Sequence, residues 1–102
     1  MPITPATPDD LDDLAPLFDA YRQFYGFPSD LPAARAFLHA RLIRGESVVL
    51  LARDADHHAT GFVQLYPTFT SLAPGPSFIL HDLFVVPAAR RSGIATGLLR
   101  AA

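Results

Sequence analysis

The hydrophobic residues of this chain change their spacing near Gly45, and this change constrains the fold more than any other feature of the sequence. Over residues 8–44 the apolar side chains recur three and four positions apart, which is the period of an amphipathic helix. After Gly45 they fall into short runs with β-branched and aromatic residues, over 47–53, 60–70 and 77–86. A glycine halfway through the helical region divides it, so the sequence predicts two helices followed by three strands.

Short segments at the two ends of the chain complete the predicted fold. Residues 2–6 are extended, and residues 7–10 combine a hydroxyl cap, a proline in the first turn and two acidic side chains, which mark a helix N-terminus. Residues 93–102 have the composition of a third helix. The predicted order is β-α-α-β-β-β-α, an α+β (α/β sandwich-like) fold with helices packed on a mixed, largely antiparallel sheet.

Length and composition exclude several classes of protein. A chain of 102 residues cannot bury two separate apolar cores, so residues 1–102 are expected to form one domain. The chain has no cysteine, and its four histidines lack the spacing of metal ligands, so we expect neither a disulfide nor a metal. A net charge of −2 without a basic run argues against a nucleic-acid partner. The lack of cysteine, of a transmembrane segment and of a signal peptide predicts a cytoplasmic protein with no membrane partner.

The junction between the last strand and the last helix, residues 84–96, has the clearest chemical use. A hydrophobic strand ends, a loop turns, and a helix begins with the small residues Gly93 and Ala95. The first turn of a helix offers unpaired N–H groups and a positive dipole end, and small side chains let a phosphate approach that backbone. The side chains that could add charge-assisted hydrogen bonds are Arg90, Arg91 and Thr96. An ordinary strand-to-helix turn, with Gly93 present only for backbone geometry, explains these residues equally well.

The same junction resembles motif A of the GNAT superfamily of N-acetyltransferases. The resemblance rests on the spacing Arg90-x-x-Gly93-x-Ala95, on the strand before it and on the order of elements, so it extends over the whole chain. It implies an acyl-CoA N-acyltransferase fold and acetyl-CoA as cosubstrate. The positions that it implies for binding the pantetheine arm and the pyrophosphate are Leu83, Phe84, Val85, Arg90, Arg91, Ser92, Gly93, Ile94, Ala95 and Thr96.

The resemblance also implies that an amine attacks the thioester carbonyl directly, without a covalent enzyme intermediate. The incoming amine must lose a proton, and histidine is suited to accept one near neutral pH. We expect His81 to be this base, because some family members carry a glutamate base at the matching position, and Asp82 is the weaker candidate. Period-two alternation predicts that His81 shares a face with Leu83 and Val85, whereas Asp82 and Phe84 share the other. A hydrogen-bonded histidine at the rim of the core is the alternative for His81.

Aromatic residues near the end of the first helix resemble the acceptor segment of acetyltransferases that act on polyamines and amino acids. The residues expected to contact the acceptor are Tyr21, Tyr25 and, on the opposite wall, Tyr66. Six aspartates and one arginine in residues 1–30 could attract a cationic amine. Aromatic side chains at helical spacing are more often core residues, so that interpretation stays open for the two helical tyrosines.

The strand over 77–86 leads to a prediction about association. It is the most hydrophobic strand of the chain, so both of its faces must be covered. Family members continue beyond residues 93–102 with further strands and a helix, so the resemblance implies a truncated domain that lacks the C-terminal part of the fold. The fourth strand would then keep an exposed edge, which predicts a homo-oligomer formed through that edge.

Three functions are consistent with these observations. The leading one is an acetyl-CoA-dependent N-acetyltransferase that acts on the primary amine of a small molecule. A catalytically incomplete acyl-CoA-binding remnant and a protein-interaction module are the alternatives.

Overall fold

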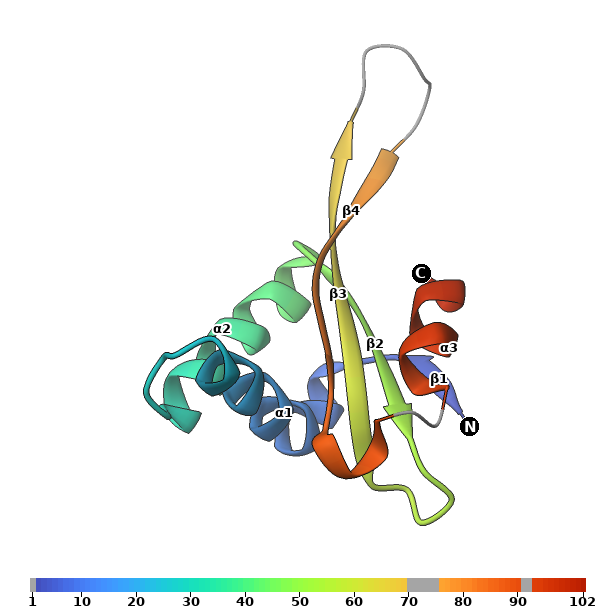
Figure 1. The fold of residues 1–102 in the computed structure, drawn as a ribbon. Coiled ribbons are helices and arrows are strands. Elements are labelled where there is room, and N and C mark those ends of the chain that lie inside the picture. The colour runs from blue at the N-terminus through green and yellow to red at the C-terminus, as the bar shows by residue number, and fades with distance from the viewer. Residues whose placement is uncertain (1, 70–75, 91–92) are drawn as a thin grey trace.

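The computed structural model describes residues 2–69, 76–90 and 93–102 (Figure 1). Its elements are β1 (Ile3–Pro5), the short 3-10 helix η1 (Pro8–Asp10), α1 (Leu11–Phe24), α2 (Leu31–Arg44), β2 (Val48–Arg53), β3 (Ala59–Phe69), β4 (Pro76–Val85), the 3-10 helix η2 (Pro87–Ala89) and α3 (Ile94–Ala101). This order confirms the predicted fold class. No helix within the described ranges is both long and apolar enough to cross a membrane.

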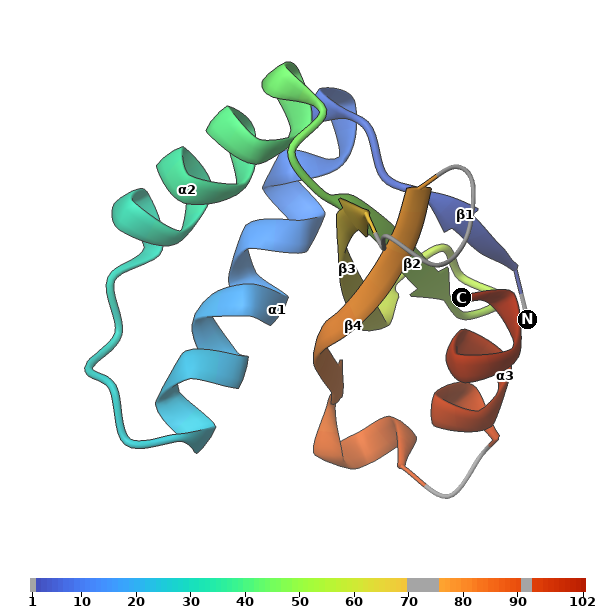
Figure 2. The same cartoon turned by 90° about the horizontal axis from the view of Figure 1, so that it is seen from above.

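The four strands form a sheet in the order β1-β2-β3-β4, and each pair of neighbours is antiparallel. Helices α1 and α2 cover one face of the sheet and α3 covers the other, as the view from above shows (Figure 2). The core therefore has two layers, because alternate strand residues point to opposite faces. The layer under α1 and α2 includes Leu14, Phe18, Leu38, Val49 and Phe62. The layer under α3 includes Leu50, Val63, Val85, Ile94 and Leu98.

The connection between α1 and α2 is held in place by the buried carboxylate of Asp19. Its two oxygens accept hydrogen bonds from the Ser29 hydroxyl at 2.6 Å, the Asp30 backbone N–H at 2.8 Å and the Gln23 amide at 3.0 Å. These bonds favour the ionised form, the Ser29 bond most strongly, and hold the pKa of Asp19 below its usual value. Asp30 in turn caps α2 by accepting a hydrogen bond from the Ala33 N–H. The position of this loop is thus set by polar contacts.

The pairing of β3 with β4 contains a bulge at His81. Gln64 pairs with Asp82, whereas the next residue, Leu65, pairs with Leu80, so His81 is an extra residue within this pairing. A bulge of this kind interrupts the strict alternation of side chains along a strand.

The bulge makes one sequence prediction wrong. Period-two alternation predicts that His81 lies on the face of Leu83 and Val85, which pack in the layer under α3. Instead, its ring lies 5.1 Å from the ring of Tyr66, and its Nδ1 lies 3.6 Å from Oδ1 of Asp82, on the side of the sheet covered by α1. The physical reason is the inserted residue. Side chains alternate between the two faces of β4 only where its pairing with β3 is regular, and the bulge interrupts that pairing.

The prediction that both faces of the fourth strand are covered is correct only for the second half of β4. Phe84 and Val85 are each 7% exposed, whereas Phe78 and Ile79 are each 52% exposed and Leu80 is 41% exposed. The first half of β4 belongs to a hairpin with β3 that extends beyond the rest of the sheet (Figure 1). Helices cover β4 only where it lies inside the sandwich.

Gly61 permits the close approach of α3 to the sheet. A Cβ at this position would lie 2.9 Å from the backbone oxygen of Phe84 and 3.3 Å from Cγ2 of Ile94. We therefore expect Gly61→Ala to lower the free energy of unfolding, measured by urea titration, by about 1–3 kcal/mol. Gly45→Ala is the control for backbone strain. Gly45 has a φ of 65°, so an alanine there is strained, but its Cβ position is open and the alanine would collide with no atom of the described residues. A Gly61→Ala variant as stable as the parent would contradict the close packing.

Candidate active site

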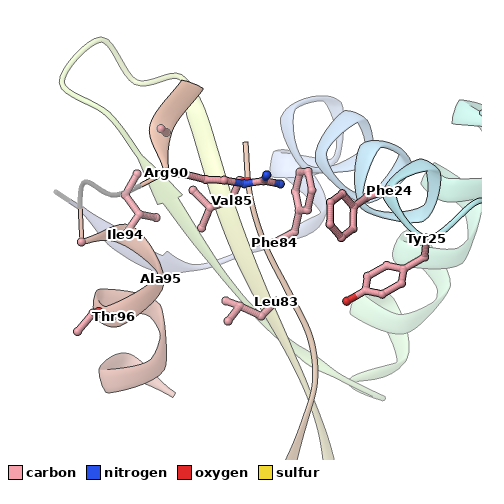
Figure 3. A pocket seen from close by; sticks show the side chains of 11 residues that line it. Phe24, Tyr25, Leu83, Phe84, Val85, Arg90, Ile94, Ala95 and Thr96 are labelled. Atoms are coloured by element: carbon pink, nitrogen blue, oxygen red, sulfur yellow. The ribbon is translucent and has the colours of Figure 1, made fainter. Parts of the chain in front are cut away.

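A cavity of about 370 Å³ lies between the end of α1, the second half of β4 and the start of α3 (Figure 3). Its lining residues are Phe24, Tyr25, Leu83, Phe84, Val85, Ala89, Arg90, Gly93, Ile94, Ala95 and Thr96. All the described residues that the sequence indicated for the pantetheine arm and the pyrophosphate therefore line one cavity. Arg91 and Ser92, which belong to the same prediction, lie outside the described residues.

The start of α3 forms one wall of this cavity. Gly93 is the N-cap with a φ of 82°, a left-handed conformation that favours glycine, and none of the described side chains caps the helix. The described part of the chain thus offers no side-chain cap to the first-turn N–H groups of Ile94, Ala95 and Thr96. Its atoms, the two chain neighbours of Gly93 aside, all lie more than 4 Å from a Cβ built at Gly93. Uncapped N–H groups at the positive end of a helix dipole suit an anion, and the space around Gly93 gives it access.

Arg90 joins the wall of the cavity to α1 and β4. Its Nε donates a hydrogen bond to the Val85 carbonyl at 2.9 Å. Its guanidinium lies 5.4 Å from the ring centre of Phe24 and 5.6 Å from that of Phe84. In Figure 3 the Arg90 side chain runs toward these two rings. The sequence indicates Arg90 as a partner for phosphate. In the structure its side chain contacts β4 and α1 instead. A role of Arg90 in binding a ligand stays a prediction.

The carboxylate of Asp82 lies at the centre of a group of side chains that we call the polar cluster: Ser47, Gln64, Asp82, Tyr21 and His81. The Tyr21 hydroxyl donates to Oδ1 of Asp82 at 2.7 Å, and the Gln64 amide donates to Oδ2 at 2.8 Å. The Ser47 hydroxyl donates to the other end of the Gln64 amide at 2.9 Å. Burial, together with the bond to Asp82, raises the pKa of Tyr21, so its hydroxyl stays protonated as a donor.

His81 is the exposed member of the polar cluster. Its side chain is 63% exposed, whereas that of Asp82 is 12% exposed. Tyr66 contacts the edge of the His81 ring, and burial raises the pKa of the Tyr66 hydroxyl. The structure thus brings together both catalytic candidates and two of the three acceptor candidates, Tyr21 and Tyr66. The third candidate, Tyr25, lines the cavity with its ring 5.2 Å from that of Tyr21, so it lies between the cavity and the polar cluster.

Several residues of this region were not indicated by the sequence. Ala89 lines the cavity, and Ser47 and Gln64 complete the polar cluster. Phe24, which the sequence places in the aromatic segment near the acceptor, lines the cavity. The signal that the sequence offers for Gln64 is a polar residue between the apolar Val63 and Leu65, and the structure shows this residue to be fully buried. Buried amides need hydrogen-bond partners, so such a residue indicates a polar contact somewhere across the sheet.

One group of side chains outside these two regions has the composition of a metal site. Asp54, Asp56 and His58 lie on the exposed turn between β2 and β3, with one ligand atom of each within 4.8 Å of the others. Asp54 already accepts hydrogen bonds from the backbone N–H groups of Asp56 and His58, which lower its pKa and account for its position in the turn. The turn geometry is explained by these bonds.

Comparison with known proteins shows the same family over most of the chain. The model of the acetyltransferase (GNAT) family matches residues 14–102. The "Uncharacterized N-acetyltransferase YhfO" of Bacillus subtilis (strain 168) is 50% identical over 102 residues, which is 100% of this chain and 68% of that protein.

Solved structures agree with this match. The crystal structure of a "probable acetyltransferase" superposes with a TM-score of 0.93 at 46% identity and covers 99% of this chain and 68% of its own. An aminoglycoside antibiotic 6'-N-acetyltransferase from Acinetobacter haemolyticus superposes with a TM-score of 0.71 at 27% identity, with coverage of 99% and 68%. The chain spans about two thirds of the length of each of these proteins. It belongs to the GNAT family of acetyltransferases.

Proposed function

We propose that this chain binds acetyl-CoA in the cavity between β4 and α3 and transfers the acetyl group to the primary amine of a small molecule. Enzymes of the GNAT family use acetyl-CoA as cosubstrate. The observation that supports the proposal is that one cavity combines a strand, Leu83–Val85, with the uncapped start of a helix, Gly93–Thr96. A strand edge suits the amide-containing arm of the ligand, and the helix start suits its pyrophosphate.

The edge of β4 that faces away from β3 is the edge on which such an arm can bind. Leu83, Phe84 and Val85 pair with β3 on one side, and no strand in the described part of the chain pairs with β4 on the other. The backbone groups on that second edge can therefore bond the amides of a pantetheine arm as a neighbouring strand would. We assign the diphosphate to the N–H groups of Ile94, Ala95 and Thr96, which no side chain of residues 2–69, 76–90 or 93–102 caps.

The chemical step needs a group that removes a proton from the amine. The amine nitrogen forms a bond to the acetyl carbonyl carbon, the carbon–sulfur bond breaks, and CoA leaves with the electron pair. His81 would accept the proton that the amine loses, and the carboxylate of Asp82 would stabilise the resulting imidazolium. The acetyl group passes directly from sulfur to nitrogen, so no nucleophilic side chain is required.

The acceptor is proposed to be an amine of the polyamine or amino-acid type. Tyr21, Tyr25 and Tyr66 place aromatic rings near the carboxylate of Asp82, and this combination suits a small cation. The similar aminoglycoside 6'-N-acetyltransferase also acts on the amine of a small molecule, which supports the class of acceptor. We also propose that the protein acts in the cytoplasm, because a chain without cysteine fits a reducing compartment.

Calorimetry with acetyl-CoA and an assay for released CoA test the two halves of this proposal. We expect heat of binding with acetyl-CoA alone, and release of free CoA when a polyamine or an amino acid is added. Absence of both heat and a thermal shift at millimolar acetyl-CoA would refute the binding site.

Acyl-CoA binding without turnover is the second candidate, because His81 and Asp82 do not line the cavity. Binding of acetyl-CoA without CoA release for any amine tested would favour this candidate. Stoichiometric capture of another protein without affinity for acetyl-CoA would favour an interaction module instead.

The exposed half of β4 is proposed to mediate formation of a homo-oligomer. Ile79 is 52% exposed on a strand whose outer edge has no described partner, and apolar strand edges pair with one another. We expect light scattering after size exclusion to show a dimer or larger species, and Ile79→Lys to shift it toward monomer. Ile43→Lys is the matched control, because Ile43 is 60% exposed on α2. A monomer at high protein concentration would contradict association.

A further inference from the structure

The polar cluster places a buried carboxylate beside an exposed histidine. We propose that Asp82, held by Tyr21 and Gln64, fixes the neutral imidazole of His81 in the tautomer with its proton on Nδ1. Nε2 then carries the free lone pair and is the atom that accepts a proton. The catalytic use of Nε2 rests on the proposed function, whereas the tautomer itself does not.

The orientation of the Asp82 carboxylate follows from its donors. The Tyr21 hydroxyl donates to Oδ1 and the Gln64 amide donates to Oδ2, so each oxygen has a protein partner. A carboxylate only accepts hydrogen bonds, so the end of Gln64 that faces Asp82 must be the NH₂ group. The Ser47 hydroxyl then donates to Oε1 at the opposite end of the amide. Because Ser47, Gln64 and Asp82 are all buried, solvent cannot readily replace these bonds.

The position of His81 follows from the bulge in β4. The extra residue brings the His81 and Asp82 side chains to the same side of the sheet, with Nδ1 3.6 Å from Oδ1. That distance allows electrostatic attraction, and catalytic hydrogen bonds are often this long before a ligand binds. Arg41 on α2, which is paired with Glu46, acts electrostatically on Tyr66. Among the described residues that contact His81 or Asp82, the other titratable groups are Tyr66 on β3 and Tyr21 on α1. Both hydroxyls have raised pKa values and stay neutral, so Asp82 is the charged group that faces Nδ1.

The chain contains an internal comparison for this pair. His58 lies 3.5 Å from Asp54, nearly the same distance as His81 from Asp82, but its side chain is 77% exposed and that of Asp54 is 42% exposed. Asp54 also accepts two backbone hydrogen bonds. Both histidines are exposed, so the two pairs differ chiefly in the carboxylate, and water screens Asp54 more than it screens Asp82. We therefore expect Asp82 to select a tautomer and Asp54 not to.

Proton–nitrogen correlation spectra of the isotope-labelled chain, recorded where the imidazoles are neutral, distinguish the two tautomers. The signals of His81 are assigned by their loss in His81→Gln. We expect the Nδ1–H form at His81 in the parent and the Nε2–H form, which free imidazoles prefer, in Asp82→Asn. Tyr21→Phe should give an intermediate result, because it removes one bond and leaves the carboxylate. The His58 signals should stay the same in all variants, which shows that the fold is intact.

Thr60→Val is the control for a lost buried hydrogen bond. Thr60 is buried in the same sheet and donates to the Ala52 carbonyl, away from the polar cluster, so its replacement should leave the His81 tautomer unchanged. A His81 tautomer that is the same in Asp82→Asn and in the parent would overturn the proposal.

Kinetics then test the use of this tautomer. Asp82→Asn should lower kcat about 10- to 100-fold with the KM for acetyl-CoA unchanged, by analogy with the loss of carboxylates that orient metal-ligating histidines. An unchanged kcat would overturn the catalytic use of Nε2. If the tautomer depends on Asp82 but no amine is acetylated, the positioning of His81 stands and the proposed function fails.

Discussion

Replacing Gly93 by aspartate is expected to weaken the binding of acetyl-CoA at least about 100-fold, measured by calorimetry. Gly93 caps the start of α3 with open space around its Cβ position, so the new carboxylate would enter the site assigned to the diphosphate. Two like charges 4 Å apart repel by about 4 kcal/mol at an effective dielectric constant of 20, and a 100-fold loss corresponds to about 2.7 kcal/mol. The carboxylate would also satisfy the helix N-terminus that otherwise attracts the ligand.

Gly93→Asn is the matched control for this variant. Asparagine has the shape of aspartate and tolerates the left-handed conformation of Gly93 as well as aspartate does, but it carries no charge. We expect it to weaken binding less than about 5-fold, which is the share of the effect due to backbone strain and bulk. If Gly93→Asp binds acetyl-CoA as tightly as the parent, the diphosphate does not lie at the start of α3. If both variants lose binding equally, loop geometry rather than charge is responsible.

Replacing His81 by glutamine is expected to lower kcat at least about 100-fold, because a general base commonly contributes 100- to 10,000-fold to the rate. Glutamine keeps the polarity and the approximate size of the side chain but cannot accept a proton at neutral pH. His81 does not line the cavity, so the affinity for acetyl-CoA should be the same as in the parent. Calorimetry and the CoA-release assay measure these two quantities separately.

His39→Gln is the control, because His39 is exposed on α2 and has the same chemistry in a different place. Its kcat and affinity should match the parent. A His81→Gln variant that keeps its kcat would show that another group, or the solvent, takes the proton. A variant that loses affinity for acetyl-CoA as well would place His81 in cofactor binding.

The helices and the order of elements could be predicted because their signals are local. The apolar spacing of Leu14 and Phe18, four residues apart, places both on the side of α1 that packs on the sheet. Proline in the first turn and the left-handed Gly45 each mark a helix end from within a few positions of that end. The residues that line the cavity could be indicated in the same way, because Leu83–Val85 and Gly93–Thr96 belong to one continuous junction.

The bulge at His81 could not be predicted in this way. Alternation along β4 depends on how β4 is paired with β3, and the register shift opposite Gln64 and Leu65 has no signature within residues 77–86 themselves. The inserted residue moves His81 from the layer of Leu83 to the side of Asp82. The chemistry of imidazole indicates His81 as a candidate base, whereas the pairing of β4 with β3 determines which side chains lie around it.

By itself the sequence determined the order of the elements, the strand-to-helix junction and the small residues that leave the start of α3 open, because each depends on residues close together in the chain. Only the tertiary structure decided which side chains surround Asp82. Tyr21 is 61 residues away from it along the chain and Gln64 is 18 residues away, and they meet because α1 lies across the face of β3 and β4. The physical reason is that a hydrogen bond between distant segments is formed only after packing has fixed both of them in place.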